Sequence, residues 1–378
     1  MFTFFFELNN KKKFLFVFLL FVVVSFFIQT IFKGLNNSCD LMWQPSKLFW
    51  EGINHYEYQL KTQDIFLGCQ KGQYGHFLFI VLYPITIFDW EQAKFIWVVV
   101  NIFFAISIPI IICRFSNFST ILTCLVLGIF LTSHPTRMTI NYGQNSLMMF
   151  FCIMLTYVFS NNKYQNSIPI ISGISYVKYS TGYILFLSLL VDRQYKKLFL
   201  SMFLTIFGWL FYSFYTDSNL VESFFGPFKL ILHGNYVRTG DLYSIMNMYF
   251  LKEVNFINKM IQVSIALILN IYFLIQIKNI KDNLAKLSVV CFLPLIFLPH
   301  SNYDYVLLLP TLIFGIKNYS LKISKYCICL VIYYFYFNRL IRHLIDSDIF
   351  YQSGMFLICV TFIIVFTNFL KNNYSKTT

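Results

Sequence analysis

The residue best placed to do chemistry is Asp40, which directly follows the first long apolar segment of the chain. The surrounding segment carries two tryptophans, Trp43 and Trp50, and ends in the turn Gly52-Ile53-Asn54-His55-Tyr56. A carboxylate at a membrane interface, partly shielded by tryptophans, can serve as a general base toward a hydroxyl. An aspartate that caps a short interfacial helix would give the same pattern, so residue chemistry alone leaves both interpretations open.

Two internal polar elements could bind a substrate. Lys178 lies in the apolar stretch 167–191 with no acidic residue nearby in the sequence. Because a lysine in lipid is costly, we expect it to face a cavity or an anionic ligand such as a lipid phosphate; the alternative is an interfacial break between two short helices. Gly143-Gln144-Asn145 could be a hinge whose amides bind a sugar, or simply a helix start.

A third polar element is the cluster His300-Ser301-Asn302-Tyr303-Asp304, on a short turn between apolar segments. In a functional interpretation, His300 would bind or protonate a phosphate, with Tyr303 and Asp304 beside it. Short polar turns are also ordinary between helices. Because this turn is expected on the same side of the membrane as Asp40, the functional interpretation is favoured.

Long apolar segments must position these residues. The 378 residues are 58% hydrophobic and only 12% charged, with a mean hydropathy of +0.64. This composition predicts one integral membrane domain, 1–378, of the all-α class. Apolar runs near the ~20 residues that cross a bilayer predict about twelve membrane-spanning helices. They are 14–32, 75–88, 94–113, 119–133, 144–160, 167–191 as one broken helix, 197–216, 258–277, 287–299, 305–316, 325–341 and 353–370.

The charges orient these helices. Basic tracts place both termini and the loops 192–197, 278–286 and 317–325 in the cytoplasm under the positive-inside rule. The opposite side receives a first loop, 33–74, a second large loop, 217–257, and the short loops 300–304 and 342–352. The side of His134 to Asn145 stays open, because its parity depends on whether 167–191 crosses once or twice. The net charge of +13 is spread over these tracts, which argues against nucleic-acid binding.

Most acidic residues fall on one side of this topology. The four outside loops hold eleven of the sixteen: Asp40, Glu51, Glu57, Asp64, Asp217, Glu222, Asp241, Glu253, Asp304, Asp346 and Asp348. Proton-coupled transporters usually place carboxylates in the middle of helices, whereas most acidic residues of this chain lie in loops. P-loop, zincin, paired-CxxC and GxSxG signatures are absent from the sequence, so neither a cofactor nor a metal is expected. Cys39 and Cys69 bracket the first loop, and whether they pair is open.

Taken in order, these motifs resemble the family 87 glycosyltransferases. That family's pattern has an Asp opening the first outside loop, a Gly-x-Asn-Pro-Tyr turn, a tyrosine and a proline leading into the next helix, a Gly-Gln-x-Asn element, an internal Lys and a late Ser/His/Tyr cluster. The matching residues are Asp40, Gly52 to Tyr56, Tyr74 and Pro84, Gly143 to Asn145, Lys178, and Pro299 to Tyr305. His55 replaces the usual Pro, Asn145 follows Gln144 directly, and Tyr179 stands where a Pro usually follows the Lys.

The resemblance implies a GT-C-like enzyme of the plasma (inner) membrane. It would move a hexose, typically mannose, from a polyprenyl-phosphate sugar to a lipid or glycan acceptor of the cell envelope, with inversion and on the extracytoplasmic side. Asp40 would be the catalytic base, and Lys178 and His300 would bind the donor phosphate. Asn54, Tyr56, Gln144, Asn145, Tyr303 and Asp304 would bind substrate. The competing classes are a lipid or glycan transporter and an envelope polysaccharide polymerase or ligase.

Overall fold

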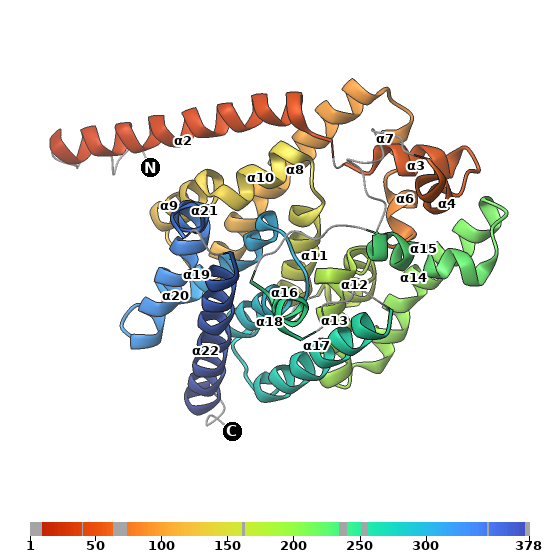
Figure 1. Ribbon diagram of the computed structural model, residues 1–378. Coiled ribbons are helices and arrows are strands. Elements are labelled where there is room, and N and C mark those ends of the chain that lie inside the picture. Colours follow the sequence, from red (N-terminus) through yellow and green to blue (C-terminus); the bar gives the residue numbers. More distant parts are fainter. Residues whose placement is uncertain are drawn as a thin grey trace.

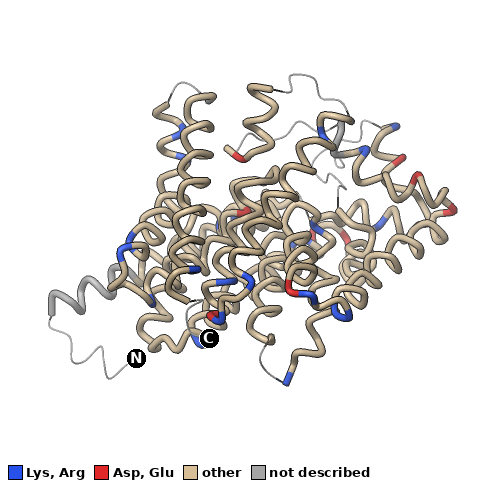
Figure 2. Tube along the Cα trace, turned by 90° about the horizontal axis from the view of Figure 1, so that it is seen from below, with Lys and Arg blue, Asp and Glu red and all other residues tan. Residues whose placement is uncertain are grey.

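The computed structural model describes residues 10–39, 41–62, 74–160, 163–233, 240–250, 256–345 and 348–374. All regular elements in these ranges are helical, as Figure 1 shows, which confirms the predicted all-α class. Charged residues are sparse along the helices (Figure 2). Large apolar side chains such as Phe199, Phe203 and Phe214 are exposed on the outer helices, as expected of a surface that faces lipid.

Several helices confirm the multi-pass membrane character. In the described ranges, five are long and apolar enough to cross a bilayer: α2 (Asn10–Asn37), α8 (Trp90–Phe115), α14 (Tyr195–Tyr215), α17 (Phe256–Ile277) and α22 (Asp348–Tyr374). A sixth candidate joins α9 (Thr120–Thr132) to α10 (His134–Tyr142) across a 56° bend. The total of about twelve crossings stays a prediction.

The remaining helices are shorter. The central ones are α11 (Ser146–Val158), η1 (Gln165–Ser167), α12 (Ile168–Ser175), α13 (Tyr179–Val191), α18 (Asn283–Phe297), η2 (Asn302–Leu308) and α19 (Leu309–Lys317). The chain then forms α20 (Lys322–Ile332), the π-helix η3 (Tyr333–Phe337) and α21 (Asn338–Leu344). The helices of the two large loops are α3 (Trp43–Trp50), α4 (His55–Lys61), α6 (Phe77–Val81), α7 (Tyr83–Thr86), α15 (Leu220–His233) and α16 (Leu242–Tyr249).

The segment 75–88, predicted as a short span, does not form one. It holds α6 and α7, of five and four residues, and at a rise of about 1.5 Å per residue neither can cross a bilayer. Figure 1 shows both beside α3 and α4. Trp50 joins them to α3, because its Nε1–H donates to Phe79 O (3.0 Å) and its ring packs on Tyr83. The first large loop therefore extends to the start of α8.

The stretch 167–191, predicted as one broken helix, is a hairpin. Ile168 at the start of α12 and Asp192 just after α13 line the same cavity, so the two helices run in opposite directions. Their contact is close because Gly182 of α13 lies against the backbone of Ser175 in α12, where a Cβ would stand 1.9 Å from the Ser175 carbonyl oxygen. Lys178 is the N-cap residue of α13, at the turn of the hairpin.

Packing against α2 places the segment His134 to Asn145, whose side the sequence left open. Gly128 in α9 lies against Val23, and Ile140 in α10 lies against Gly34, so α9 and α10 run in the same direction as α2. Gly143, which ends α10 in the left-handed conformation (φ +70°), lies against Ser38 at the end of α2. This segment therefore lies on the side of the first large loop.

The main hydrophobic core is formed by α8, α11, α13 and the C-terminal helices from α17 onward. Two smaller clusters attach the first loop to it. One surrounds Leu41, Trp43 and Trp97, and the other surrounds Phe49, Tyr56 and Tyr212. Burial of these aromatic side chains holds the loop helices on the membrane domain.

Candidate active site

A buried ion pair lies at the turn of the α12–α13 hairpin. The Lys178 ammonium contacts Asp304 Oδ1 and donates to Ser146 Oγ (2.8 Å), while Ser146 Oγ–H donates to Asp304 Oδ1 (2.7 Å). The Lys178 and Asp304 side chains are only 8% and 2% exposed. Three segments far apart in sequence thus meet at one polar cluster: the start of α11, the hairpin turn and η2.

This pair corrects the expectation that Lys178 has no acid nearby. Asp304 is 126 residues away in the chain, so the sequence around Lys178 does not reveal it. Burial by itself would raise the pKa of Asp304, but the Lys178 charge and the hydrogen bonds from Lys178, Ser146 and the Ser301 backbone outweigh it. The pKa of Asp304 therefore lies below its ordinary value, and the carboxylate is ionised at neutral pH.

The pair leaves part of the Lys178 ammonium available. Lysine has three N–H donors, and Ser146 and Asp304 accept two of them in the described part of the chain. The charge also lies 5.0 Å from the centroid of the Tyr303 ring. Tyr303 O accepts a hydrogen bond from Thr139 Oγ (3.4 Å), which holds the start of η2 against α10. A ligand oxygen at the third N–H position would be the next acceptor for this cation.

His300 lies in the same turn and faces a second carboxylate. Its Nδ1 is 3.6 Å from Asp241 Oδ2 and 3.2 Å from Leu298 O, and both the His300 and Asp241 side chains are almost fully buried. Its ring packs on Tyr305 (centroids 5.1 Å apart). Asp241 caps α16 by accepting from the Ser244 N–H (2.7 Å). The second large loop therefore reaches into the site through this aspartate.

The neighbouring amides, Gln144 and Asn145, are both buried. Gln144 Oε1 accepts from Tyr74 OH (3.3 Å), so the tyrosine and glutamine of the expected pattern do meet. Asn145 precedes Ser146 of the ion-pair cluster, and neither polar atom of its side chain has a hydrogen-bond partner in the described residues. A buried amide without a partner is unusual, and Asn145 is the strongest candidate here for a group that awaits a substrate hydroxyl.

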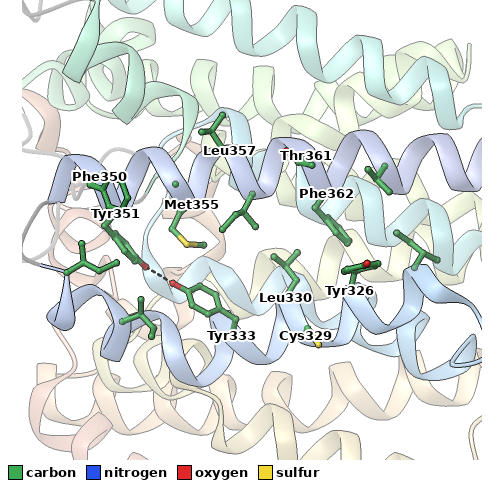
Figure 3. Close-up of a pocket in the computed structure, with 16 residues that line it drawn as sticks. Tyr326, Cys329, Leu330, Tyr333, Phe350, Tyr351, Met355, Leu357, Thr361 and Phe362 are labelled. Atoms are coloured by element: carbon green, nitrogen blue, oxygen red, sulfur yellow. Dashed lines mark hydrogen bonds between the residues drawn. The ribbon is translucent and has the colours of Figure 1, made fainter.

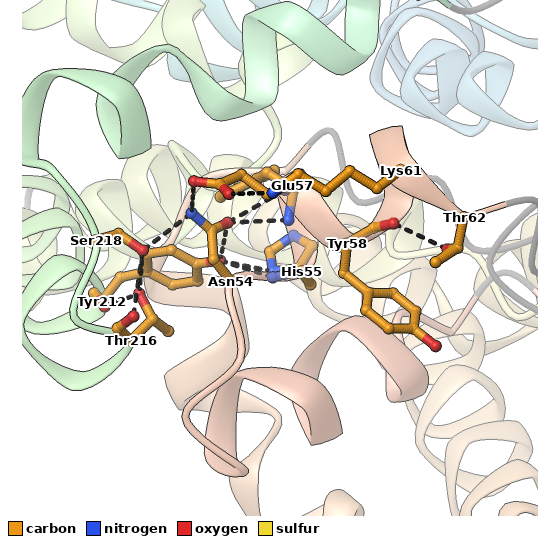
Figure 4. A network of polar contacts seen from close by, with 10 residues as sticks. Asn54, His55, Glu57, Tyr58, Lys61, Thr62, Tyr212, Thr216 and Ser218 are labelled. Carbon is orange, nitrogen blue, oxygen red and sulfur yellow. Dashed lines mark hydrogen bonds and ion pairs between the residues drawn. The ribbon is translucent and has the colours of Figure 1, made fainter.

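Asn54 lies in a network of polar contacts that holds the first loop together (Figure 4). Asn54 caps α4 by accepting from the Tyr56 and Glu57 N–H groups, and it donates to Ser218 Oγ (2.9 Å). The Tyr56 hydroxyl donates to Tyr74 O (3.0 Å). His55, at the position of the usual proline, is buried and bonds the Tyr212 hydroxyl through its N–H (3.1 Å). These contacts position the loop; a role for Asn54 and Tyr56 toward substrate stays a prediction.

Asp40 lies outside the described residues, between Cys39 and Leu41. Its neighbours place the expected base only approximately. Leu41 and Trp43 belong to the cluster that contains Tyr74 and Met148, and Ser38 lies against Gly143. Cys39 is disulfide-bonded, while the seven other described cysteines are free; Cys69, whose pairing with Cys39 the sequence left open, is also outside the described residues.

A long apolar groove runs beside this site, between α20–α21 and α22 (Figure 3). Its volume is about 880 Å³, and its lining includes Leu330, Tyr333, Tyr351, Met355 and Phe362. Gly240, which precedes Asp241, packs against Met355 of the groove wall, with the position of its Cβ 3.2 Å from Met355 Cβ. The groove wall therefore contacts the second large loop next to Asp241.

The model of one protein family, Glycosyltransferase family 87, matches residues 73–299, which is more than half of the chain. The chain belongs to glycosyltransferase family 87. No curated protein and no solved structure matches it significantly. Membership in family 87 establishes the expected resemblance and a glycosyltransferase activity in a membrane protein, with a sugar donor and an acceptor as its substrates.

Two residues of this candidate site could not be predicted from the sequence. Ser146 follows Asn145 and resembles any helix-start serine, and Asp241 has the pattern of an N-cap. The local sequence carries no signal that joins either to Lys178 or His300. Their role appears only when α11, α16 and η2 are packed together, so a contact between distant segments was the missing information.

Proposed function

We propose that this family 87 protein transfers a hexose from a polyprenyl-phosphate sugar to a lipid or glycan acceptor of the cell envelope. Mannose is the sugar that we propose first, and the extracytoplasmic face of the plasma membrane is the proposed side. The observation that carries the proposal is membership in family 87. The apolar groove, whose wall packs against Gly240 next to Asp241, supports a lipid-borne donor, because an isoprenoid chain would fit a groove lined almost entirely by apolar side chains.

In the proposed mechanism, Asp40 removes the proton from the acceptor hydroxyl as its oxygen attacks the anomeric carbon. The bond between that carbon and the phosphate oxygen breaks on the opposite face, which inverts the configuration, and the polyprenyl phosphate leaves with the electron pair. General base catalysis of this kind contributes roughly 10² to 10⁴ in rate. Holding both lipid-borne substrates at one interface lowers the barrier further.

The departing phosphate gains negative charge, which Lys178 and His300 would stabilise. Lys178 would use its third N–H, while Asp304 and Ser146 hold the ammonium in place. Asp241 would orient the His300 ring through Nδ1. The buried Asn145 amide, with Gln144 and Tyr303 nearby, is proposed to bind sugar hydroxyls, and Asn54 and Tyr56 to hold the first loop over the substrate.

The test compares Asp40→Asn with Glu51→Gln, an exposed carboxylate in the same loop. Membranes of expressing cells would be given radiolabelled polyprenyl-phosphate sugars, and transfer to lipid or glycan would be measured. We expect Asp40→Asn to lose at least 100-fold in rate at unchanged expression, while Glu51→Gln keeps wild-type transfer. Near-wild-type transfer by Asp40→Asn would exclude it as the base.

The same membranes separate the competing classes. Movement of the labelled lipid across the bilayer without glycosyl transfer would indicate a transporter, and growth of long polymers would indicate a polymerase. A panel of donors that differ in the sugar identifies the hexose, because mannose is favoured only by the family. A failure of every polyprenyl-phosphate donor, with transfer from a nucleotide sugar, would overturn the proposed donor class.

A further inference from the structure

A small cavity at the end of α2 gathers three cations. It has a volume of about 190 Å³ and lies where the last turns of α2 meet α10 and α21. Its charged and polar lining includes Lys33, His134, Arg137, Asn141 and Arg339, and none of its lining residues is acidic. We call these five residues the basic pocket. This volume is well above the roughly 10–15 Å³ needed to hold one water molecule, and it leaves room for a phosphate group.

The described residues provide no counter-charge for the basic pocket. The ion pairs of that part of the chain involve none of Lys33, Arg137 and Arg339. Arg137 instead donates from Nη2 to Gln29 Oε1 (3.0 Å), and its guanidinium lies 4.7 Å from the centroid of the Phe26 ring. Like charges that share a cavity repel one another, and a bound anion would remove that cost.

Three buried polar atoms in the basic pocket have no hydrogen-bond partner among the described residues. They are His134 Nε2, Arg137 Nε and Asn141 Oδ1, and all three are inaccessible to solvent. Such atoms are rare in native proteins. Arg137 Nε–H and a His134 N–H are donors, and the Asn141 amide presents its own N–H after a rotation about χ2. Donors that converge on one cavity suit the oxygens of a phosphate.

The position of the pocket indicates where the phosphate comes from. The pocket lies at the C-terminal end of α2, which is the outer end in the predicted orientation, where clustered cations run against the positive-inside rule. Only 11% of α2 from Leu20 to Asn37 is buried, as expected of a helix that faces lipid, and its outer end would lie at the depth of the headgroups. We propose that the basic pocket binds the phosphate of a membrane lipid headgroup.

The basic pocket is distinct from the Lys178–Asp304 cluster. α10 separates the two, because Thr139 faces Tyr303 of the cluster while His134, Arg137 and Asn141 line the pocket. The inference therefore does not rest on the proposed glycosyl transfer. A lipid held here would bridge α2, α10 and α21 and would fix the outer end of α2 next to the first loop.

The experiment uses the full chain, purified into phosphatidylcholine nanodiscs that contain a minor fraction of phosphatidic acid. Native mass spectrometry counts retained phosphatidic acid, and a thermal scan reports its stabilising effect. We expect the wild type to retain phosphatidic acid. Arg137→Gln and Arg339→Gln should each lower its retention about tenfold or more, since each removes a charge-assisted contact. Arg114→Gln changes an exposed cation near the C-terminal end of α8 and outside the basic pocket. This variant should retain phosphatidic acid fully.

Two further measurements identify the source of the bound phosphate and control for misfolding of the variants. Inorganic phosphate at millimolar concentration is tested in lipid without phosphatidic acid; stabilisation by inorganic phosphate alone would overturn the lipid source in favour of a free anion. Lys33→Gln changes an exposed side chain and should fold normally while weakening retention. Equal retention by wild type, Lys33→Gln and Arg137→Gln would overturn the proposal.

Discussion

Lys178 and Asp304 show why a buried charge is informative in a membrane protein. Burial of either charged side chain without the other would be unfavourable, because an unpaired buried charge costs several kcal/mol. Their pairing, with Ser146 bonded to both, makes the hairpin turn and η2 depend on each other. The pair thus has a structural role beside any role in binding phosphate, and the two roles can be separated by substitution.

At Lys178, we expect either single change, Lys178→Ala or Asp304→Ala, to destabilise the protein by roughly 3–5 kcal/mol, since each leaves its partner buried and unpaired. The double variant Lys178→Met/Asp304→Leu should recover most of that stability, because well-packed apolar side chains replace an ion pair at little cost. Thermal unfolding of the purified protein measures the change. Glycosyl transfer should stay lost in the double variant if Lys178 binds the donor phosphate; its recovery would assign the pair to structure alone.

His76 gives a prediction about pH. It is buried against Tyr56 and Tyr212, and burial lowers its pKa to about 4, although the hydrogen bond to Ser223 O opposes the shift. In the unfolded chain the pKa is about 6.5. Between these values the unfolded state binds the extra proton, so stability is complete above about pH 6.5 and falls as pH decreases toward 4, by up to ~1.4 kcal/mol per pH unit.

The measurement is the unfolding temperature between pH 7 and pH 5. His76→Gln keeps a donor for Ser223 O and removes the titration, so its profile should be flatter than that of the wild type. His343→Gln, at an exposed histidine, should follow the wild-type profile. A wild-type profile no steeper than that of His76→Gln would contradict the assignment.

At the scale of elements, the α12–α13 hairpin depends on one close approach. A Cβ on Gly182 would overlap the Ser175 carbonyl, and backbone cannot move aside as a flexible side chain would. Gly182→Ala should therefore destabilise by about 3 kcal/mol, the upper end for overpacking. Gly354→Ala is the matched control, since nothing lies within 4 Å of its added Cβ and alanine is the better helix former by about 0.5–1 kcal/mol. An equal effect of both changes in thermal unfolding would contradict the close contact.

The long helices could be predicted from sequence, and the hairpin could not. Lipid demands uninterrupted apolar runs whatever the tertiary context, so 94–113, 197–216 and 258–277 indicated α8, α14 and α17 within a few residues. The stretch 167–191 satisfies the same rule as a broken span or as a hairpin. Only the packing of Gly182 on Ser175 distinguishes the two, and the same is true of Lys178 and Asp304, whose contact joins residues far apart in the chain.

At the scale of the whole molecule, the hairpin and the loop helices move one predicted crossing along the chain without changing the predicted total of twelve. The segment 75–88 contributes no span, while 167–191 folds into two helices in place of one. Residues 134–145 consequently end on the same side as the first loop, which brings Gln144, Lys178 and His300 toward the segment that contains Asp40. A shared side for these residues is what the proposed reaction requires.

Accessible cysteines in intact cells test this arrangement. In a background with Cys124→Ser and Cys329→Ser, which removes the two free described cysteines that are not buried, single substitutions would be labelled with a membrane-impermeant maleimide. We expect Tyr142→Cys and Glu51→Cys to be labelled from outside, because both side chains are exposed on the first-loop side. Asn117→Cys, in the turn after α8, and Lys196→Cys, in a basic tract, should react only after permeabilisation. Labelling of Asn117→Cys in intact cells together with protection of Tyr142→Cys would reverse the orientation of α8 to α10 and separate the Gln144 segment from the first loop.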